Sequence, residues 1–154
     1  MQGAFHWLRV QTFCYATEDE ELIHDTMEEL LDTDEFDCDI AESEHGNRLI
    51  ILQHELTKQK EFVALFSKFG EDVIGSLIDD ADKKIDDDCT FYMRLDKQKA
   101  VQGEYRIAHH GDVISITGKV VSHPARKEIA TSNFSEFLKK LDLTPKTVPQ
   151  PSDE

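Results

Sequence analysis

The segment RLDKQKAVQGEYRI, residues 94–107, holds the side chains best suited to binding an anion. It carries four Lys or Arg residues and two acids, in a chain of 154 residues whose formal net charge is −15. Lys and Arg bind phosphate groups through charge and hydrogen bonds, and Gln can add hydrogen bonds to bases or sugars. This local excess of cations predicts an anion site, and the backbone of RNA is our leading candidate for the anion.

The charge of the chain is divided into an acidic block and a basic block. Residues 15–46 contain fourteen acids and no Lys or Arg, whereas residues 89–127 contain seven bases and three acids. An overall excess of acids repels nucleic acid, so we expect binding to come from the basic block, or with help from salt or metal ions, while the acidic block faces away. The bases of that block are Arg94, Lys97, Lys99, Arg106, Lys119, Arg126 and Lys127.

The basic segment reads as a strand, a tight connection or single helical turn, and a second strand. In strand geometry Arg94 shares a face with Tyr92, while Lys97 and Lys99 are expected to be exposed and flexible in the connection. We therefore predict that both lysines reach phosphates. The alternative that stays open is that these lysines are solvated and pair with nearby acids.

Other chemistry has no visible signature. The seven glycines are scattered, which argues against a phosphate-binding loop. The acidic stretch 79–88 would put Lys84 and Ile85 where an EF-hand needs a ligand and a glycine, and His109 and His110 would point to opposite faces of a strand. We predict a non-catalytic protein without a cofactor or metal; a metal-dependent nuclease using the carboxylates of 79–88 is the weakest alternative.

Hydrophobic periodicity predicts an α+β fold. The element order indicates a two-layer sandwich, with a mixed or antiparallel sheet and helices packed on one side. The predicted strands cover residues 4–16, 36–44, 48–57, 89–95, 103–108 and 113–121, and the predicted helices cover 17–31, 58–69, 71–85 and, as a broken helix, 125–141.

Local signals refine the helix ends and the domain boundaries. Thr17 and Glu20 predict a capping box for the first helix, and Ser132 or Asn133 predicts the start of a second half in the last one. We expect a single domain over residues 1–143, with a smaller lobe from about residue 88 as an alternative, and a disordered tail over residues 144–154. The expected hairpin turn at His45-Gly46-Asn47 joins the second and third strands.

The remaining composition indicates a cytoplasmic protein with reduced thiols. The three cysteines form no CxxC pair, which argues against a disulfide framework or a zinc knuckle, and we expect them to be buried. No run approaches the roughly 18 apolar residues of a membrane helix, and the first ten residues lack the pattern of a signal peptide. We expect no membrane partner.

Four stretches together resemble a known family. They are FCYATEDEELI (13–23), ESEHGNRLIIL (42–52), RLDKQKAVQGEYRI (94–107) and GDVISITGKVVSHPARKE (111–128). In order and approximate spacing they are similar to an archaeal RNA-binding protein family described as a predicted exosome subunit, formerly a domain of unknown function.

The resemblance implies a compact α+β homodimer that binds RNA, with subunits of the exosome as predicted partners. Where this family often has a proline after the turn asparagine, the chain has Arg48, which adds a cation. The family's basic and polar motif maps onto Arg94, Asp96, Lys97, Gln98 and Gly103, and its turn motif onto His45, Gly46 and Asn47.

These observations combine into one functional prediction, a non-catalytic RNA-binding protein linked to the archaeal exosome or to RNA processing. The alternative is an acidic, dimeric adaptor that binds proteins without touching RNA. Gln98 and Asn47 would read bases or the 2′-hydroxyl, and Tyr92 or Tyr105 would stack on bases. The predicted RNA-binding residues are Arg94, Lys97, Gln98, Lys99, Arg106, Lys119, Arg126, Lys127, Asn47 and Arg48.

Overall fold

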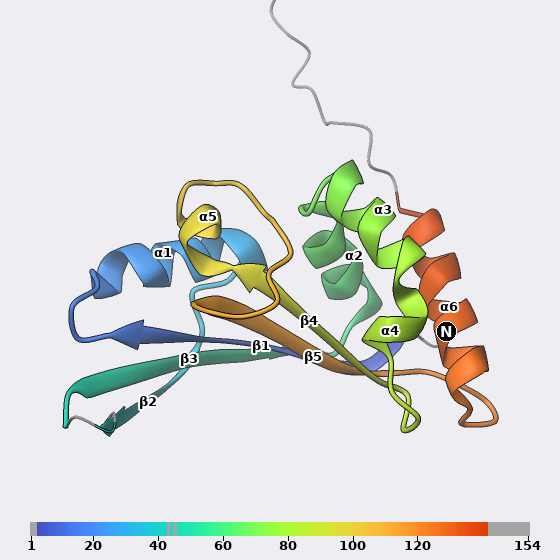
Figure 1. The fold of residues 1–154 in the computed structure, drawn as a ribbon, viewed down its shortest axis with the longest axis horizontal. Helices are drawn as coiled ribbons and strands as arrows, with labels where there is room; N and C mark the ends of the chain where they lie inside the picture. Colours follow the sequence, from blue (N-terminus) through green and yellow to red (C-terminus); the bar gives the residue numbers. More distant parts are fainter. Residues whose placement is uncertain (1–2, 43, 45, 142–154) are drawn as a thin grey trace, which may run out of the picture.

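The computed structural model of the chain describes residues 3–42, 44 and 46–141. Within this part the chain forms five strands and six helices in the order β1-α1-β2-β3-α2-α3-α4-β4-α5-β5-α6, which Figure 1 shows in space. The strands are β1 (Phe5–Tyr15), β2 (Asp37–Glu42), β3 (Arg48–Leu56), β4 (Thr90–Asp96) and β5 (Val113–Val120). The helices are α1 (Glu20–Leu31), α2 (Gln59–Ser67), α3 (Glu71–Asp79), α4 (Ala81–Lys84), α5 (Lys97–Val101) and α6 (Lys127–Lys139).

The strands form one antiparallel sheet in the order β2-β3-β1-β5-β4. The predicted hairpin of β2 and β3 is confirmed, with Glu42 opposite Arg48 next to the turn. The α+β fold class is confirmed as well. His45, in the middle of the predicted turn, lies outside the described residues, whereas Gly46 has a φ of 77°, a conformation in which glycine has no Cβ penalty.

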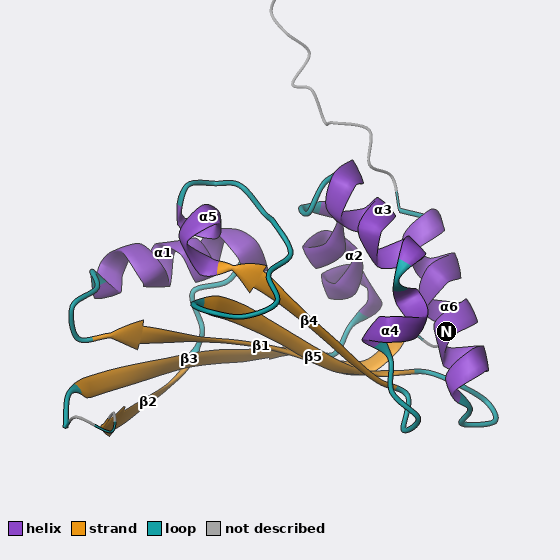
Figure 2. Cartoon of the chain, viewed as in Figure 1, coloured by secondary structure: helices purple, strands orange, loops and turns teal. Residues whose placement is uncertain are grey.

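Alternation along the strands gives the sheet one packed face and one open face. In β1, Leu8, Val10 and Cys14 are buried while Arg9 and Phe13 between them are exposed, which is the period-two pattern of a half-buried strand. The helices gather over the face of the buried residues and around one end of the sheet (Figure 2). We call the other side, to which Arg9 and Phe13 point, the open face.

A cluster of aromatic rings joins the sheet to the helices. Phe5 of β1 stacks on Phe66 of α2 with ring centroids 5.7 Å apart, and Phe91 of β4 packs against Phe134 of α6 at 4.7 Å. All four rings are buried. Burying a side chain of this size contributes roughly 1.5–3 kcal/mol, so this cluster holds the two layers together.

Gly118 of β5 lies at a position in the sheet that leaves no room for a side chain. A Cβ atom there would lie 2.4 Å from Cδ2 of Leu8 and 2.8 Å from the carbonyl oxygen of Trp7, which cannot move without disturbing β1. We predict that Gly118→Ala lowers the free energy of unfolding by about 1–3 kcal/mol, measured by urea denaturation. Gly75→Ala on α3 is the control, because its added Cβ would meet nothing within 4 Å; equal loss in both variants would contradict the packing account.

The predicted strand over residues 103–108 is wrong. Only one bridge forms, between Leu95 and Ile107, with backbone hydrogen bonds from the Asp96 N–H to the Arg106 carbonyl and from the Ala108 N–H to the Arg94 carbonyl. The reason is that Tyr105 turns toward the helices, where its ring packs on Phe69 at 6.0 Å, and the alternation breaks there. The segment therefore covers only one end of the outer edge of β4.

Three predicted details of helix ends and cysteine burial are also wrong. Helix α1 starts after Asp19, whose Oδ1 accepts hydrogen bonds from the next turn, so Thr17 makes no capping box. Helix α6 is continuous because buried Phe134 follows the predicted break, and Asn133 Nδ2 donates to the Val121 carbonyl instead of capping a helix. Cys38 is exposed, since β2 is an edge strand, although the other two cysteines are buried.

The sheet spans the predicted domain boundary. β5, from the later part of the chain, pairs with β1 near the start of the chain, and both contribute to one hydrophobic core. The domain limits and the alternative lobe from residue 88 stay predictions, and the tail at 144–154 lies outside the described residues. Of the helices that the structure describes, none is long and apolar enough to cross a membrane.

Candidate nucleic-acid interface

Lys97, the centre of the predicted site, is buried. The prediction that it is exposed is wrong: its relative exposure is 0%. Its Nζ donates to the Phe13 carbonyl at 2.7 Å and forms ion pairs with Glu18 at 2.6 Å and Asp112 at 2.9 Å. The ammonium also lies 5.0 Å from the ring centre of Tyr15. A cation enclosed in this way supports the fold, and its charge is already balanced by two carboxylates.

Gln98 completes the same network from the next position of α5. Its Nε2 donates to Glu18 Oε2 at 3.2 Å and to Asp112 Oδ2 at 2.9 Å. Burial raises the pKa of Glu18, but the hydrogen bonds from Lys97, from the Tyr15 N–H and from Gln98, together with the charge of Lys97, outweigh it and leave the pKa below its ordinary value. Glu18 is therefore held as a carboxylate, and it ties α5 to the end of β1.

The lowered pKa of Glu18 predicts a pH dependence of stability. The folded-state pKa lies below the unfolded value of roughly 4.3, so the stabilisation is fully present above that pH and is lost as the pH falls through the folded pKa. In urea denaturation, Glu18→Gln should therefore be less stable than the parent protein near neutral pH, with the difference shrinking as the pH falls below roughly 4.3. A difference that stays constant over this range would contradict the assignment.

The structure separates most of the other predicted residues. Arg106 is ion-paired with Glu104 and lines a hollow on the helix side together with Asp72. Lys99 is half-buried on α5. The rest lie apart from these: Asn47 and Arg48 follow the turn between β2 and β3, and Arg126 and Lys127 begin α6. Only Arg94 and Lys119 lie on the open face of neighbouring strands.

A hollow of about 270 Å³ opens beside Arg94, at the outer edge of β4. Because Ile85 bridges to Phe91, the end of α4 lies next to β4 (Figure 1). Lys83 and Lys84 line the hollow from there. None of its lining residues in the described part of the chain carries a carboxylate. The lining residues are Lys83, Lys84, Tyr92, Met93, Arg94, Ala108, His109, Ser115, Ile116 and Thr117. We call this site the cationic hollow.

The backbone of β4 borders the cationic hollow. The outer edge of β4 is covered at Thr90 by a hydrogen bond from the Asp86 N–H and at Arg94 by one from the Ala108 N–H. Alternate residues of a strand direct their N–H groups to the same edge, so the Tyr92 N–H also points outward, and in the antiparallel bridge between Ile85 and Phe91 it faces the Lys84 carbonyl. The backbone at this edge is therefore engaged by the chain itself, and anion binding in the hollow depends on the side chains of Lys83, Lys84 and Arg94.

The cations around the hollow have weak or backbone partners. Lys83 lies 3.8 Å from Asp80, and both side chains are exposed, so this pair stabilises little. Arg94 Nη1 donates to the His109 carbonyl at 3.2 Å, and Lys119 Nζ donates to the carbonyl of Asp88. Backbone carbonyls orient Arg94 and Lys119 without cancelling their charge, so both side chains keep their positive charge near the hollow.

Neutral polar side chains cross the open face from β3 to β4. Cross-strand pairing sets Gln53 opposite Gln11, Gln11 opposite Ser115, and Ser115 opposite Arg94. Exposed aromatic side chains lie on either side of this row. At the far edge, β2 presents Asp37 and Asp39. The open face thus runs from an acidic edge at β2 to a cationic edge at β4.

Sequence reasoning missed Lys83 and Lys84. Their pair stands among the acids of 79–88, and the helix-like pattern there gave no indication of a nearby strand. A usable signal existed, because the run Asp86-Asp87-Asp88 is typical of a turn and the predicted strand at 89–95 starts directly after it. A turn of that length returns the chain beside its own path, which brings the two lysines to the edge of β4.

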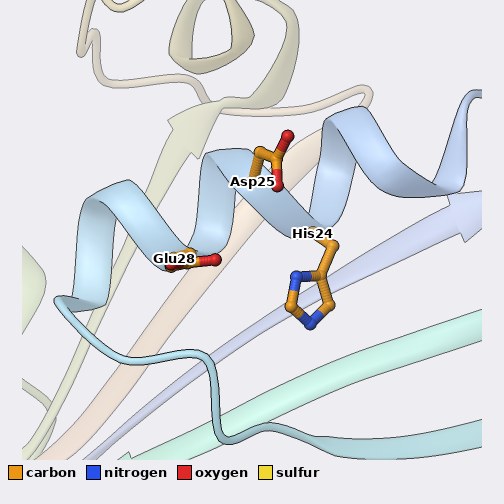
Figure 3. Close-up of side chains that lie close together, drawn as sticks. All are labelled: His24, Asp25 and Glu28. Carbon is orange, nitrogen blue, oxygen red and sulfur yellow. The ribbon is translucent and has the colours of Figure 1, made fainter.

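A group of potential metal ligands lies elsewhere, on α1. Ligand atoms of His24, Asp25 and Glu28 are within 4.8 Å of one another. In Figure 3, however, the His24 ring and the Asp25 carboxylate extend to different sides of the helix. The His24 ring packs edge-on against Phe36 with centroids 4.8 Å apart, which explains its position without an ion. We assign no metal site to this group.

Fold and site together define an α+β protein with an antiparallel sheet that helices cover on one face and with cations grouped at the β4 edge. A family model described as RNA binding matches residues 7–120, and the chain belongs to this RNA-binding family. It is 31% identical over 151 residues to RNA-binding protein PAB1135 from Pyrococcus abyssi. The alignment covers 89% of this chain and 96% of that protein. The resemblance predicted from the sequence is confirmed.

Two solved structures share the fold. Mth689, a DUF54 protein from Methanothermobacter thermautotrophicus, aligns with a TM-score of 0.74 and 28% identity over 87% of this chain and 98% of its own. AF2318 from Archaeglobus fulgidus, also of DUF54, aligns with a TM-score of 0.71 and 27% identity over 86% and 99% of the two chains. The overall fold of this chain is therefore shared with solved DUF54 proteins.

Proposed function

We propose that this protein is a non-catalytic RNA-binding protein that holds RNA phosphates in the cationic hollow at the edge of β4. The observation that carries the proposal is the grouping of Lys83, Lys84 and Arg94 around a cavity whose described lining has no carboxylate. Membership of an RNA-binding family supports RNA as the ligand. Lys119, on the open face of the neighbouring strand, extends the phosphate path along the sheet.

The proposal changes the list of contacts that the sequence suggested. Lys97 and Gln98 are left out because their polar atoms are already used by Glu18 and Asp112. Arg106 is left out because acids surround it. Lys99, Asn47, Arg48, Arg126 and Lys127 remain secondary candidates, since they lie away from the hollow.

Partners and assembly are proposed from the family resemblance. We propose a cytoplasmic homodimer that associates with exosome subunits or other RNA-processing proteins. The competing function, an acidic adaptor without RNA contact, is favoured by the acids concentrated on α1 and β2. Affinity purification with and without nuclease distinguishes the two: an RNA-dependent association fits the RNA-binding proposal, and a nuclease-resistant one without direct RNA binding fits the adaptor.

The salt dependence of RNA binding tests the phosphate contacts. Four cations, Lys83, Lys84, Arg94 and Lys119, predict a slope of log affinity against log salt of about −3 for single-stranded RNA. Fluorescence anisotropy with a labelled oligonucleotide at several salt concentrations measures this slope. Lys84→Gln should make it shallower by about 0.7, whereas Lys139→Gln at the far end of α6 should leave it unchanged. Equal slopes in all three proteins would remove the hollow from the account.

A further inference from the structure

We infer that the RNA is single-stranded and that its bases stack on aromatic side chains of the open face, with Phe13 and Tyr92 as the main platforms. This inference rests on the proposed function, because the cationic hollow must hold the backbone before bases can reach the sheet. It adds the class of RNA and the surface that the bases contact.

The open face exposes aromatic rings that the fold does not use. Phe13 is 39% exposed and Tyr92 is 51% exposed, although burying them would be favourable. Tyr15 is 42% exposed, but its ring is engaged by Lys97 and contacts Phe13 edge-on. Stacking of bases on aromatic rings is worth about 1–3 kcal/mol per base and accepts any base, so such rings serve as platforms for unpaired nucleotides.

The strand register sets the spacing of the two platforms. Tyr92 lies opposite Thr117, which lies opposite Arg9, four residues from Phe13 on β1. Four residues along a strand and two strand spacings across the sheet separate the platforms by roughly 16 Å. The neutral row of Gln11 and Ser115 lies between them and can hydrogen-bond to base edges. An extended strand of a few nucleotides would pass over both rings.

A duplex would not fit this surface in the same way. Base pairs within an A-form helix are stacked on one another, so their faces are closed to protein side chains, and recognition uses the shallow groove and the 2′-hydroxyls. The rings of Phe13 and Tyr92 could therefore not stack on the bases of a duplex. The acidic edge at β2, with Asp37 and Asp39, would also repel the second backbone of a wide duplex.

Charge fixes how the strand lies on the sheet. The hollow at β4 attracts phosphates, whereas β2 at the opposite edge carries acids, so the backbone follows β4 and the bases point toward β1. The carboxylates nearer the path are already engaged: Glu55 pairs with Arg9 at 3.3 Å, and Asp96 accepts a hydrogen bond from the Lys99 N–H at 3.0 Å. The central part of the open face is therefore open to uncharged bases.

The experiment compares a labelled single-stranded RNA with the same sequence in a duplex, using anisotropy at one fixed salt concentration. We expect the single strand to bind more tightly than the duplex. Phe13→Leu should weaken single-strand binding about tenfold and leave duplex affinity and the salt slope unchanged. Leu22→Ala on α1, which removes an exposed apolar side chain from the helix side, is the control and should have no effect.

The outcomes separate this inference from the proposed function. If both RNAs bind equally and Phe13→Leu has no effect, while Lys84→Gln still changes the salt slope, base stacking is wrong and the phosphate site stands. If neither RNA binds, or if the salt slope is independent of Lys84, the proposed function itself is wrong. Circular dichroism of Phe13→Leu confirms that the variant is folded, so a loss of binding is assigned to the ring.

Discussion

Replacing Lys97 with Met should lower the free energy of unfolding by about 3 kcal/mol, the largest stability effect we expect from a single substitution. The variant leaves Glu18 and Asp112 facing each other without the cation between them, and it removes the donor to the Phe13 carbonyl. Breaking a buried ion pair by removing one partner is strongly destabilising because the remaining charge is uncompensated. Urea denaturation near neutral pH measures the difference.

Two further variants test whether the effect comes from this network. Lys99→Met, on the same short helix but half-buried, should change stability by less than about 0.5 kcal/mol. Adding Glu18→Gln to Lys97→Met should recover part of the loss, because it removes one of the unpaired charges. Lys97 would not have the structural role assigned to it if Lys97→Met were as stable as Lys99→Met. The same conclusion would follow if adding Glu18→Gln to Lys97→Met lowered the free energy of unfolding further.

The second large effect concerns RNA affinity. The double substitution Lys84→Glu with Arg94→Glu should weaken binding of a single-stranded RNA by roughly 100-fold at low salt, because each change replaces an attractive phosphate contact by a repulsive one. It changes the formal net charge from −15 to −19, two charges lost and two gained. Anisotropy titrations and circular dichroism would show whether affinity falls while the fold is retained.

A control variant with the same net charge separates the effect of where the charges lie from the effect of total charge on RNA affinity. Lys139→Glu with Lys140→Glu produces the same net charge, −19, at exposed positions where α6 ends. This control should lose only a few-fold in affinity, since its charges are distant from the hollow and screened. Similar losses in the two double variants would mean that total charge, and not the cationic hollow, controls binding.

The sequence was sufficient to predict the sheet and the main helices. The alternating strands and the apolar stripe of α1 are local signals, and they predicted the α+β class and the β2–β3 hairpin. The strand at 103–108 was wrong because Tyr105 looked like part of an alternating pattern, while in the structure its ring packs on Phe69, a partner distant in sequence. Nothing within the segment itself indicates that partner.

The site could be predicted only in part, for the same physical reason. Residue type alone favours an exposed Lys97, and its burial depends on Glu18, 79 positions earlier, and on Tyr15 beside it. Arg94 was placed on the same face as Tyr92, and the structure confirms that arrangement. Lys83 was missed because its contribution comes from the tertiary path of α4 past the edge of β4.

The most direct test of the central claim is an NMR titration of the isotopically labelled protein with a short single-stranded RNA. We predict that the largest amide shifts occur at Lys84, Tyr92 and Arg94, where the hollow meets the outer edge of β4, and that α1 and the end of α6 show none. Shifts concentrated on α1, or on residues 97–106 with β4 unaffected, would contradict binding of phosphates in the cationic hollow.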